Sequence, residues 1–348
     1  MRAAVLQEFG EPLEIQDIDR PEPEPHGVVI ELEACGICRS DWHGWKGHMS
    51  PELVGTVIGH EPAGRVIEIG NQVESLEEGD HVAAAMNLAD GSCPRCLSGK
   101  SNLCENQRVF GFDMQTQGAW AEELAIPWAD VNTVKLPDGA SPVEMAGLGC
   151  RFMTGYNAVA HRGQAGPGDW VAVHGCGGIG LSSIQTASAL GAGVVAVDID
   201  DEKLAFARDL GADATVNVSD VEDVPGEVQD ITDGGADVSV DALGIDETCL
   251  NAIDSLGFSG RHVQVGVPTP EDDGVDLPIG AMLGKEISVM GNVGMPPFRF
   301  GELVRMYEQG RIDPGAQVTR EVSLENVGER LDAMTDYETL GIEVITEF

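Results

Sequence analysis

A glycine-rich hexapeptide between an apolar segment and a helical segment constrains the fold of this chain more than any other feature. The sequence Gly-Cys-Gly-Gly-Ile-Gly at 175–180 directly follows the apolar segment Trp170–His174 and opens a helical pattern that continues to Leu190. Asp198 ends the next apolar segment, 18 residues after Gly180, near the spacing at which a carboxylate receives a ribose hydroxyl group. This order of features predicts a Rossmann fold that binds a dinucleotide, rather than a tight turn without a ligand.

The glycines of this loop have separate expected roles. Gly175 permits the turn after the strand, Gly177 lets the backbone approach the pyrophosphate, and Gly180 allows the helix to pack closely. The start of the helix, at Gly178 and Ile179, supplies positive potential for the phosphate groups. We therefore expect the pyrophosphate to bind at this helix N-terminus.

The end of the second apolar segment predicts which coenzyme is used. The carboxylate of Asp198 should accept hydrogen bonds from an unmodified ribose and repel the additional phosphate of NADP, so we expect NAD to be preferred. The following residues, 199–202, contain no arginine, and Lys203 is expected to touch the ribose. Because concentrated salt screens the repulsion, NADP should be better tolerated there than in dilute buffer.

The chain is long enough for two domains, because 348 residues exceed the usual size of one hydrophobic core. From Trp170 onward, apolar segments alternate with helical patterns, which predicts a parallel sheet with crossover helices. The expected strands are Trp170–His174, Val194–Asp198, Val238–Leu243, Arg261–Gly266 and Ile287–Met290, and the expected helices are Ile179–Leu190, Asp201–Leu210, Glu247–Leu256 and a segment from Pro297 to Gly310. The preceding region alternates like a strand over Val28–Ala34 and is rich in glycine, which indicates a β-rich domain.

The net charge restricts the partners and the environment of the chain. Its 20 basic and 59 acidic residues give a formal net charge of −39, which disfavours nucleic acid and anionic membranes as partners. The acids are dispersed in runs such as Asp198–Glu202 and Glu271–Asp273, a pattern that argues against one polycation-binding site. Self-repulsion of this size should destabilise the chain unless salt screens it, so we favour a high-salt origin over a merely acidic cytoplasmic protein.

The N-terminus and the cysteines indicate the compartment. Residues 1–8 lack the apolar core of a secretion signal, and no segment reaches the length of a membrane-spanning helix. The 8 cysteines are spread over a long chain, which favours metal or catalytic roles over a disulfide framework. We therefore expect a cytoplasmic protein.

Three separated residues could form an open zinc site. Cys38, His60 and Cys150 offer two thiolates and one imidazole, which would leave the fourth tetrahedral position free. Spacing alone does not join them, because a single Cys or His is more often a buried or surface residue than a ligand. Cys35 and Cys38 also form a C-x-x-C sequence, which permits the interpretation of a redox pair.

Several ordered segments of the chain resemble motifs of the zinc-containing medium-chain dehydrogenase/reductase family, and the resemblance runs over nearly the whole chain. These segments are 36–43, 59–61, 149–154 and 175–180. The resemblance implies an α/β protein with a GroES-like, β-rich catalytic domain at 1–153 and 296–348, and a doubly wound, parallel-sheet Rossmann domain for NAD(P) at 154–295. It further implies a zinc-dependent alcohol dehydrogenase that transfers hydride reversibly between a primary or secondary alcohol and NAD(P), as a homodimer or homotetramer.

The resemblance also assigns roles in a zinc site. Cys38, His60 and Cys150 would hold the catalytic zinc, Glu61 would lie behind the metal, and Asp41 would bond the far nitrogen of His60. Bound zinc would act as a Lewis acid on the substrate oxygen.

In the same way, the resemblance assigns residues to proton transfer and coenzyme binding. Ser40 would take the proton of the alcohol and pass it, through the ribose hydroxyl group, to His43. Thr154 would brace the nicotinamide ring, and Arg39 would contact the pyrophosphate unless it is simply a solvated arginine.

A second cysteine cluster resembles the structural-zinc lobe of the family. Cys93, Cys96 and Cys104 occupy this lobe, and Asp90 stands where the family usually has a fourth cysteine. Because aspartate is an acceptable zinc ligand, we predict a zinc site of three thiolates and one carboxylate. The alternative is a lobe that has lost its metal.

Other features depart from the family pattern or fall outside the sites. The segment Leu340–Val344 lacks the arginine that the family often supplies to the coenzyme phosphates, so phosphate binding should depend more on backbone amides. Cys176 and Cys249 have no neighbouring ligands in the sequence and are expected to be packing residues.

The substrate is predicted only by class. Apolar residues could line a pocket for uncharged alcohols or aldehydes: Trp42, Trp45, Met49, Phe112, Met114, Met295 and Phe298. Simple or aromatic primary alcohols are favoured, and a polyol or amino-acid dehydrogenase of the same family is the alternative. A zinc-free quinone reductase is disfavoured by the three zinc-type ligands, and a non-catalytic dinucleotide-binding protein remains open.

Overall fold

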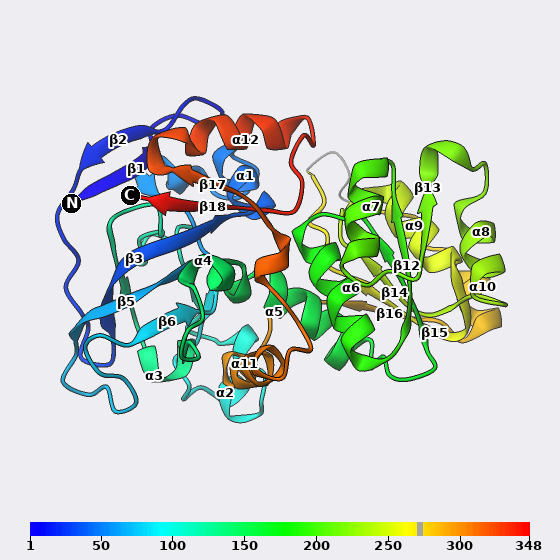
Figure 1. Ribbon diagram of the computed structural model, residues 1–348, viewed down its shortest axis with the longest axis horizontal. Helices are drawn as coiled ribbons and strands as arrows, with labels where there is room; N and C mark the ends of the chain where they lie inside the picture. Colours follow the sequence, from blue (N-terminus) through cyan, green and yellow to red (C-terminus); the bar gives the residue numbers. More distant parts are fainter. Residues whose placement is uncertain (270–273) are drawn as a thin grey trace. The chain divides into compact units, whose positions relative to one another are not determined.

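The computed structural model describes residues 1–269 and 274–348, so the acidic run Glu271–Asp273 lies outside the described residues. The chain divides into two units (Figure 1), which are Met1–Met153 with Gly294–Phe348, and Thr154–Val293. The first boundary coincides with the predicted one, and the predicted second boundary, at 296, is two residues later. We call these parts the first unit and the second unit.

The second unit contains the parallel sheet. Among the described residues the sheet has six strands in the order β13-β12-β11-β14-β15-β16, and all of its pairings are parallel. The strands are β11 (Trp170–His174), β12 (Gly193–Asp198), β13 (Ala214–Asn217), β14 (Ala236–Asp241), β15 (Leu256–Gln264) and β16 (Ser288–Gly291). The helices are α6 (Gly178–Leu190), α7 (Asp201–Asp209), α8 (Val224–Ile231), α9 (Asp246–Asp254) and α10 (Ile279–Lys285), with a π-helix at Asn157–Arg162. The strand order reverses between β11 and β14, which is where such sheets bind nucleotides.

Both faces of this sheet are covered by helices, as the alternation of apolar residues requires. Along β11, Val171 and Val173 pack with Leu181 and Ile184 of α6, in a cluster that α7 also joins. Ala172 points to the opposite face and packs in a second cluster with α8. This arrangement gives the doubly wound fold that the sequence predicts.

Several element boundaries of the second unit differ from the sequence prediction, among them both ends of β15, which spans Leu256–Gln264 rather than Arg261–Gly266. β14 ends at Asp241 rather than Leu243, because the Asp241 carboxylate accepts the backbone N–H groups of Leu243 and Gly244 and turns the chain. α9 ends at Asp254, and Leu256 already belongs to β15, where it pairs with Ala236. The helix predicted over Glu247–Leu256 therefore included the first residue of β15.

The first unit is mainly β-structure. Its larger sheet has the order β10-β6-β5-β3-β18-β17 with β9 paired to β3, next to a sheet β2-β1-β4 and a two-stranded pair β7-β8. The strands are β1 (Arg2–Leu6), β2 (Glu14–Asp17), β3 (Val28–Ile37), β4 (Thr56–Val57), β5 (Pro62–Ile69), β6 (His81–Ala84), β7 (Asn87–Leu88), β8 (Arg108–Val109), β9 (Glu123–Ile126), β10 (Thr133–Lys135), β17 (Val318–Ser323) and β18 (Ile342–Glu347). The helices are α1 (Arg39–Trp45), α2 (Pro94–Leu97), α3 (Ala129–Asn132), α4 (Pro142–Met145), α5 (Arg151–Tyr156, which extends into the second unit), α11 (Phe300–Glu308) and α12 (Val327–Thr335).

The pairing of β3 with β5 positions the candidate metal ligands. The two strands are antiparallel, and Cys35 at the end of β3 lies opposite Pro62 at the start of β5. The N–H of Gly36 donates to the carbonyl of Glu61 at 3.1 Å. The residues just after β3 and just before β5 are therefore adjacent, although they are about 20 positions apart in the chain.

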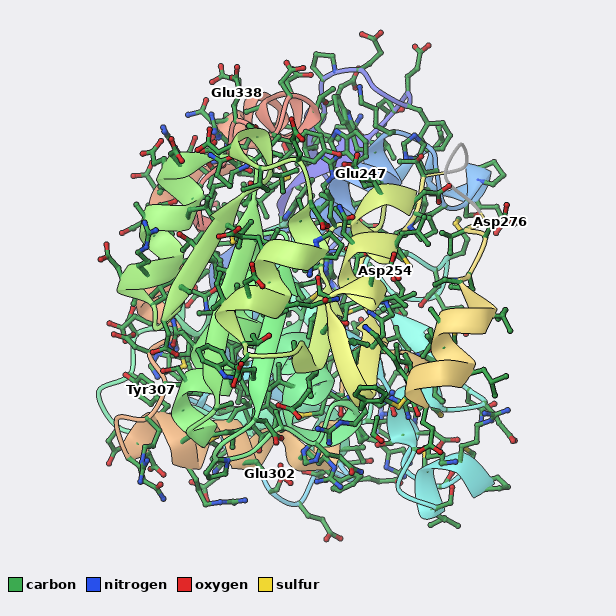
Figure 2. All side chains as sticks on the ribbon, turned by 90° about the vertical axis from the view of Figure 1, so that its right-hand side faces the viewer. Glu247, Asp254, Asp276, Glu302, Tyr307 and Glu338 are labelled. Carbon is green, nitrogen blue, oxygen red and sulfur yellow. The ribbon has the colours of Figure 1, made fainter. Side chains whose placement is uncertain are left out.

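Acidic side chains are distributed over many elements. Figure 2 labels Glu247 and Asp254 on α9, Asp276 before α10 and Glu338 after α12, and all four are exposed. None of the described helices combines the length and apolar composition needed to cross a membrane.

Candidate active site

Cys38 lies at the junction of β3 and α1, where Asp41 holds it in place. Cys38 is the N-cap residue of α1, and its backbone N–H donates to Asp41 Oδ2 at 2.8 Å. The other oxygen of the same carboxylate, Oδ1, lies 2.6 Å from Nδ1 of His60. Asp41 and His60 are both fully buried. One carboxylate therefore fixes both the first helical turn and the imidazole, and it leaves Nε2 of His60 free to act as a ligand.

Three other buried side chains come together around this imidazole. Donor atoms of Cys38, His60, Glu61 and Cys150 all lie within 4.8 Å of one another, and His60 Nε2 is 3.2 Å from Cys150 Sγ. Gly149 allows Cys150 to approach, because a Cβ at that position would lie 2.0 Å from the carbonyl oxygen of Ala84. Zinc–sulfur bonds of about 2.3 Å and zinc–nitrogen bonds of about 2.0 Å fit a cluster of this size. The donor set of two sulfurs and one nitrogen thus suits zinc.

Glu61 is held by Arg151, which is not among the predicted site residues. The backbone N–H and Nε of Arg151 each donate to Glu61 Oε1 at 3.0 Å, and Nη2 of Arg151 pairs with Oε2. Arg151 Nη1 also donates to the carbonyl of Ile37 at 3.1 Å. Because both carboxylate oxygens are engaged, Glu61 lies beside the three soft ligands as a charge-compensated neighbour. The one signal for Arg151 in the sequence is its position directly after the candidate ligand Cys150.

The two cysteines of the C-x-x-C sequence have different environments. Cys35 is fully buried in the apolar core, and burial raises the pKa of its thiol well above the ordinary value. A hydrogen bond from Cys150 and the adjacent His60 hold the pKa of Cys38 well below the ordinary value, against the effect of burial. Of these two cysteines, only Cys38 has an environment that favours the thiolate, which argues against a redox pair.

The expected proton-transfer residues lie on α1. Ser40 Oγ is 3.8 Å from Cys38 Sγ. His43 is 4% exposed, and burial, together with Arg39 and His48, lowers the pKa of His43 to about 4. The guanidinium of Arg39 stacks 3.6 Å from the Trp42 ring centroid and 4.4 Å from that of Tyr337, and it donates to the carbonyl of Met334. Arg39 is thus not a freely solvated side chain.

The glycine loop of the second unit has the geometry that a bound dinucleotide needs. Gly175 has a φ of +94°, and a Cβ on Gly180 would lie 1.8 Å from the carbonyl oxygen of Gly175. A Cβ on Gly177 would meet no atom within 4 Å, so open space lies beside the backbone at the start of α6. Asp198 Oδ2 accepts the N–H of Cys176 at 2.7 Å, which fixes the carboxylate against the loop.

Neighbouring residues of the second unit complete this region. Lys203 lies in the first turn of α7, whose N-cap Asp200 accepts the backbone N–H groups of Glu202 and Lys203. The hydroxyl group of Thr154 is buried and has no hydrogen-bond partner among the described residues. The side chain of Cys176 packs in the apolar core, as expected.

Comparison with known proteins identifies the chain. Residues 24–138 match the model of the alcohol dehydrogenase GroES-like domain, and residues 178–309 match that of the zinc-binding dehydrogenases. An alcohol dehydrogenase of Geobacillus stearothermophilus is 34% identical over 335 residues, which cover 95% of this chain and 96% of the relative. The chain belongs to the zinc-dependent medium-chain dehydrogenase/reductase family.

Further relatives extend this match over the full length of the chain. An alcohol dehydrogenase of Moraxella sp. strain TAE123 is 34% identical and covers 96% of both chains. The solved structure of an alcohol dehydrogenase from Thermus sp. ATN1 superposes with a TM-score of 0.92 at 30% identity and covers 100% of both chains. The predicted fold and the predicted class of enzyme, a zinc-dependent oxidoreductase, are thereby confirmed.

The second cysteine cluster of this dehydrogenase forms a compact set of donors. Donor atoms of Asp90, Cys93, Cys96 and Cys104 lie within 4.8 Å of one another. Backbone N–H groups of Cys96 and Glu105 point at Cys93 Sγ, and those of Asp90 and Asn106 point at Cys104 Sγ, each at 3.4 Å. Such bonds favour thiolates, which is the form that binds zinc.

Asp90 takes the place of the missing cysteine. Its Oδ1 accepts the N–H groups of Ser92 at 2.8 Å and Cys93 at 3.0 Å, and its Oδ2 accepts Nδ2 of Asn106 at 2.6 Å. Although burial opposes the effect, these bonds hold the pKa of Asp90 well below its ordinary value. The group is therefore an anion, and its Oδ1 lies 3.4 Å from the sulfur atoms of both Cys96 and Cys104.

The apolar residues expected around the substrate do not share one environment. The ring of Phe112 lies 5.1 Å from that of His60, and Trp42 is nearly buried on α1. Trp45 is a core residue whose indole N–H donates to the carbonyl of Glu11. Met295 is fully buried, whereas Met49, Met114 and Phe298 are exposed.

Proposed function

We propose that this dehydrogenase interconverts uncharged primary or secondary alcohols and the corresponding carbonyl compounds with NAD, in concentrated salt. The observation that carries the proposal is the buried set Cys38, His60 and Cys150, with His60 oriented by Asp41. Alcohol dehydrogenase is itself a known example of this ligand set, which keeps one coordination position open. The relatives from Geobacillus stearothermophilus and Moraxella, both named alcohol dehydrogenases, support the same activity.

The roles of the individual residues follow from their chemistry. Cys38, His60 and Cys150 would hold zinc, which when bound supplies Lewis-acid polarisation and a lowered pKa at the substrate oxygen. Ser40 would accept the proton of the substrate hydroxyl group and pass it towards His43. Because the pKa of His43 is lowered to about 4, this imidazole is neutral at pH 7 and can pass a proton without retaining it.

We assign the coenzyme to the second unit. The backbone around Gly175, Gly177 and Gly180 would receive the pyrophosphate, together with Gly178 and Ile179 at the start of α6. The unpartnered hydroxyl group of Thr154 would meet the nicotinamide, and Asp198 with Lys203 the adenosine ribose. Arg39 is a candidate contact of the pyrophosphate, and its guanidinium stacks on the Trp42 ring in this structure.

Replacing Asp198 with glycine is expected to narrow or invert the preference for NAD over NADP. A hydrogen bond to a charged group contributes about 1.5–3 kcal/mol, which corresponds to roughly ten- to a hundredfold in the ratio of kcat/KM values. Steady-state kinetics with both coenzymes, at low and molar salt, measure this ratio. Asp201→Asn removes the same charge three positions away and should leave the ratio nearly unchanged. A wild-type preference for NADP would show that the assignment of Asp198 is wrong.

We further propose that the lobe of Asp90, Cys93, Cys96 and Cys104 holds a second, structural zinc. The compact donor set and the N–H groups directed at the sulfurs support this assignment. A structural site uses all four tetrahedral positions for protein ligands, and the Asp90 carboxylate would supply the fourth.

A substrate panel tests the proposed activity. The enzyme would be assayed in about 2 M KCl, because molar salt screens the surface charge. The substrates would be ethanol, 1-butanol, benzyl alcohol, sorbitol and threonine, each with NAD and with NADP. Highest kcat/KM for an uncharged alcohol supports the proposal. A preference for sorbitol or threonine would instead favour the polyol or amino-acid dehydrogenase. If zinc-loaded protein that binds NAD turned over none of these substrates, the proposed activity would be contradicted.

We propose that the enzyme forms a homodimer or homotetramer through the edge of its parallel sheet. β16 is an edge strand that carries Val289; β15, which pairs with it, carries Phe258, and α10, which contacts β15, carries Leu283. These three side chains are 37%, 81% and 81% exposed. Open edges with apolar side chains favour pairing with another chain. Light scattering in molar salt should give a dimer or tetramer for the wild type, and Leu283→Asp should shift it towards monomer. A monomeric wild type at micromolar concentration would disprove this assembly.

A cytoplasmic location is supported by the state of the cysteines. All eight are free, and seven of them lie in two thiolate clusters or in apolar cores. Free thiols of this kind are typical of reducing compartments. Recovery of the protein from a secreted fraction would contradict this location.

A further inference from the structure

A second histidine lies directly against His43, and the end of α1 places it there. The N–H of His48 donates to the carbonyl of His43 at 3.0 Å, and that of Gly47 to the carbonyl of Gly44 at 3.1 Å. Gly47 has a φ of +77°. These features form a Schellman motif, in which the residue after the left-handed glycine folds back onto the third residue from the helix end. A hydrophobic contact between these two positions frequently accompanies the motif, whereas here both side chains are imidazoles.

The two rings are hydrogen-bonded through the same type of nitrogen. His43 Nδ1 and His48 Nδ1 are 3.2 Å apart, so one of them carries the shared proton and the other accepts it. Trp42 packs edge-on against both rings, with centroid distances of 4.9 Å to His43 and 5.2 Å to His48. The indole therefore holds both imidazoles in place. Nε2 of His43 lies on the far side of its ring from this bond.

The pair spans the boundary between the protein interior and solvent. His43 is 4% exposed, whereas His48 is exposed. Among the described residues, the groups whose charges shift the pKa of His43 are Arg39, His48 and Cys38, and no carboxylate is among them. None of these groups would retain a proton on His43 as a carboxylate would. The hydrogen bond to the ring of His48 therefore offers a route by which the proton can leave.

We propose that His48 is the residue through which the proton of alcohol oxidation leaves the protein. His43 gains a proton at Nε2 and loses the one on Nδ1 to His48 Nδ1, and His48 then releases a proton from Nε2 to water or buffer. No other bond changes, and each ring is neutral again when the proton has left. His48 acts through His43 and touches neither substrate nor coenzyme, so it is a positioning residue for proton transfer. The inference rests on the proposed function, because alcohol oxidation supplies the proton.

Single-turnover proton release tests this role. Enzyme with bound NAD is mixed with the primary alcohol of the panel that has the highest kcat/KM, in weak buffer with molar KCl and a pH-indicator dye. NADH formation and proton release are followed together. In His48→Ala, proton release should slow by about tenfold and lag behind NADH formation, a smaller loss than the 10²–10⁴-fold typical of a direct general base. Adding imidazole should restore the rate in this variant and leave the wild type unchanged.

Control variants separate proton transfer from a structural effect. His81→Ala removes another exposed histidine of the first unit and should release protons at the wild-type rate. His48→Asn retains a hydrogen-bonding side chain but cannot relay a proton, so it should be as slow as His48→Ala. Proton release at the wild-type rate in His48→Ala, or a loss that imidazole does not restore, would overturn the inference. Absence of NADH formation in the wild type would instead contradict the proposed function itself.

Discussion

Cys38→Ser is expected to lower kcat/KM by about 10³-fold or more, because Lewis-acid assistance contributes several kcal/mol and each 1.4 kcal/mol is a factor of ten. The serine hydroxyl group is not a thiolate, and the remaining His60 and Cys150 are too few ligands for a stable zinc site. Coenzyme binding should change little, since the glycine loop belongs to the second unit. Metal analysis, NADH fluorescence titration and steady-state kinetics measure the three quantities.

Two variants control this prediction. Cys35→Ala alters the other cysteine of the C-x-x-C sequence and should retain zinc and turnover, with some loss of stability from its buried position. Asp90→Ala should lose the zinc of the lobe and retain the catalytic one. We therefore expect two zinc ions in the wild type, from the two donor clusters, and one in each of Cys38→Ser and Asp90→Ala. Full activity of metal-free protein would refute the zinc assignment.

The melting temperature is expected to rise with KCl well into the molar range. The net charge of −39 is distributed over many elements, so neighbouring carboxylates repel one another over much of the surface (Figure 2). The screening length falls from about 10 Å at 0.1 M to about 3 Å at 1 M. Relief of several kcal/mol of repulsion should raise the melting temperature on the order of 10 °C. Calorimetry at increasing KCl, with sucrose as an uncharged control, measures this shift.

Two acids at opposite ends of α9 test the electrostatic origin of the effect. Asp254 is in the last turn, where the helix dipole disfavours a negative charge, and Glu247 is in the first turn, where it favours one. In low salt Asp254→Asn should stabilise and Glu247→Gln should destabilise the protein, each by about 0.3–1 kcal/mol. Both effects should disappear at molar salt. A melting temperature that does not depend on salt would reject adaptation to a saline environment.

The coenzyme-binding region could be predicted from the sequence because its parts are contiguous. The segment from Trp170 to Asp198 forms a strand, a turn, a helix and a second strand in immediate succession, so local residue types determine the geometry. The predicted element ends were less accurate where a side chain redirected the backbone. Asp241 shortens β14 by accepting backbone N–H groups, and apolar periodicity contains no signal for such a bond.

The candidate metal site was reached from the sequence only through family resemblance. His60 and Cys150 are 90 positions apart, and no local pattern relates them. The pairing of β3 with β5 and the approach of Gly149 to β6 place them together. The contact of His43 with His48 had a local signal, a glycine followed by histidine at a helix end, which could have been found from capping rules.

The sequence by itself determined the fold class, the two domains, the glycine loop and the types of candidate ligand, because these depend on local propensity and periodicity. Only the tertiary structure decided which donors meet, that Arg151 neutralises Glu61, that Arg39 stacks on Trp42 and that Trp45 belongs to the core. The physical reason is that long-range contacts arise from strand register and core packing. These are set jointly by residues distant in the chain, and no single segment carries the information.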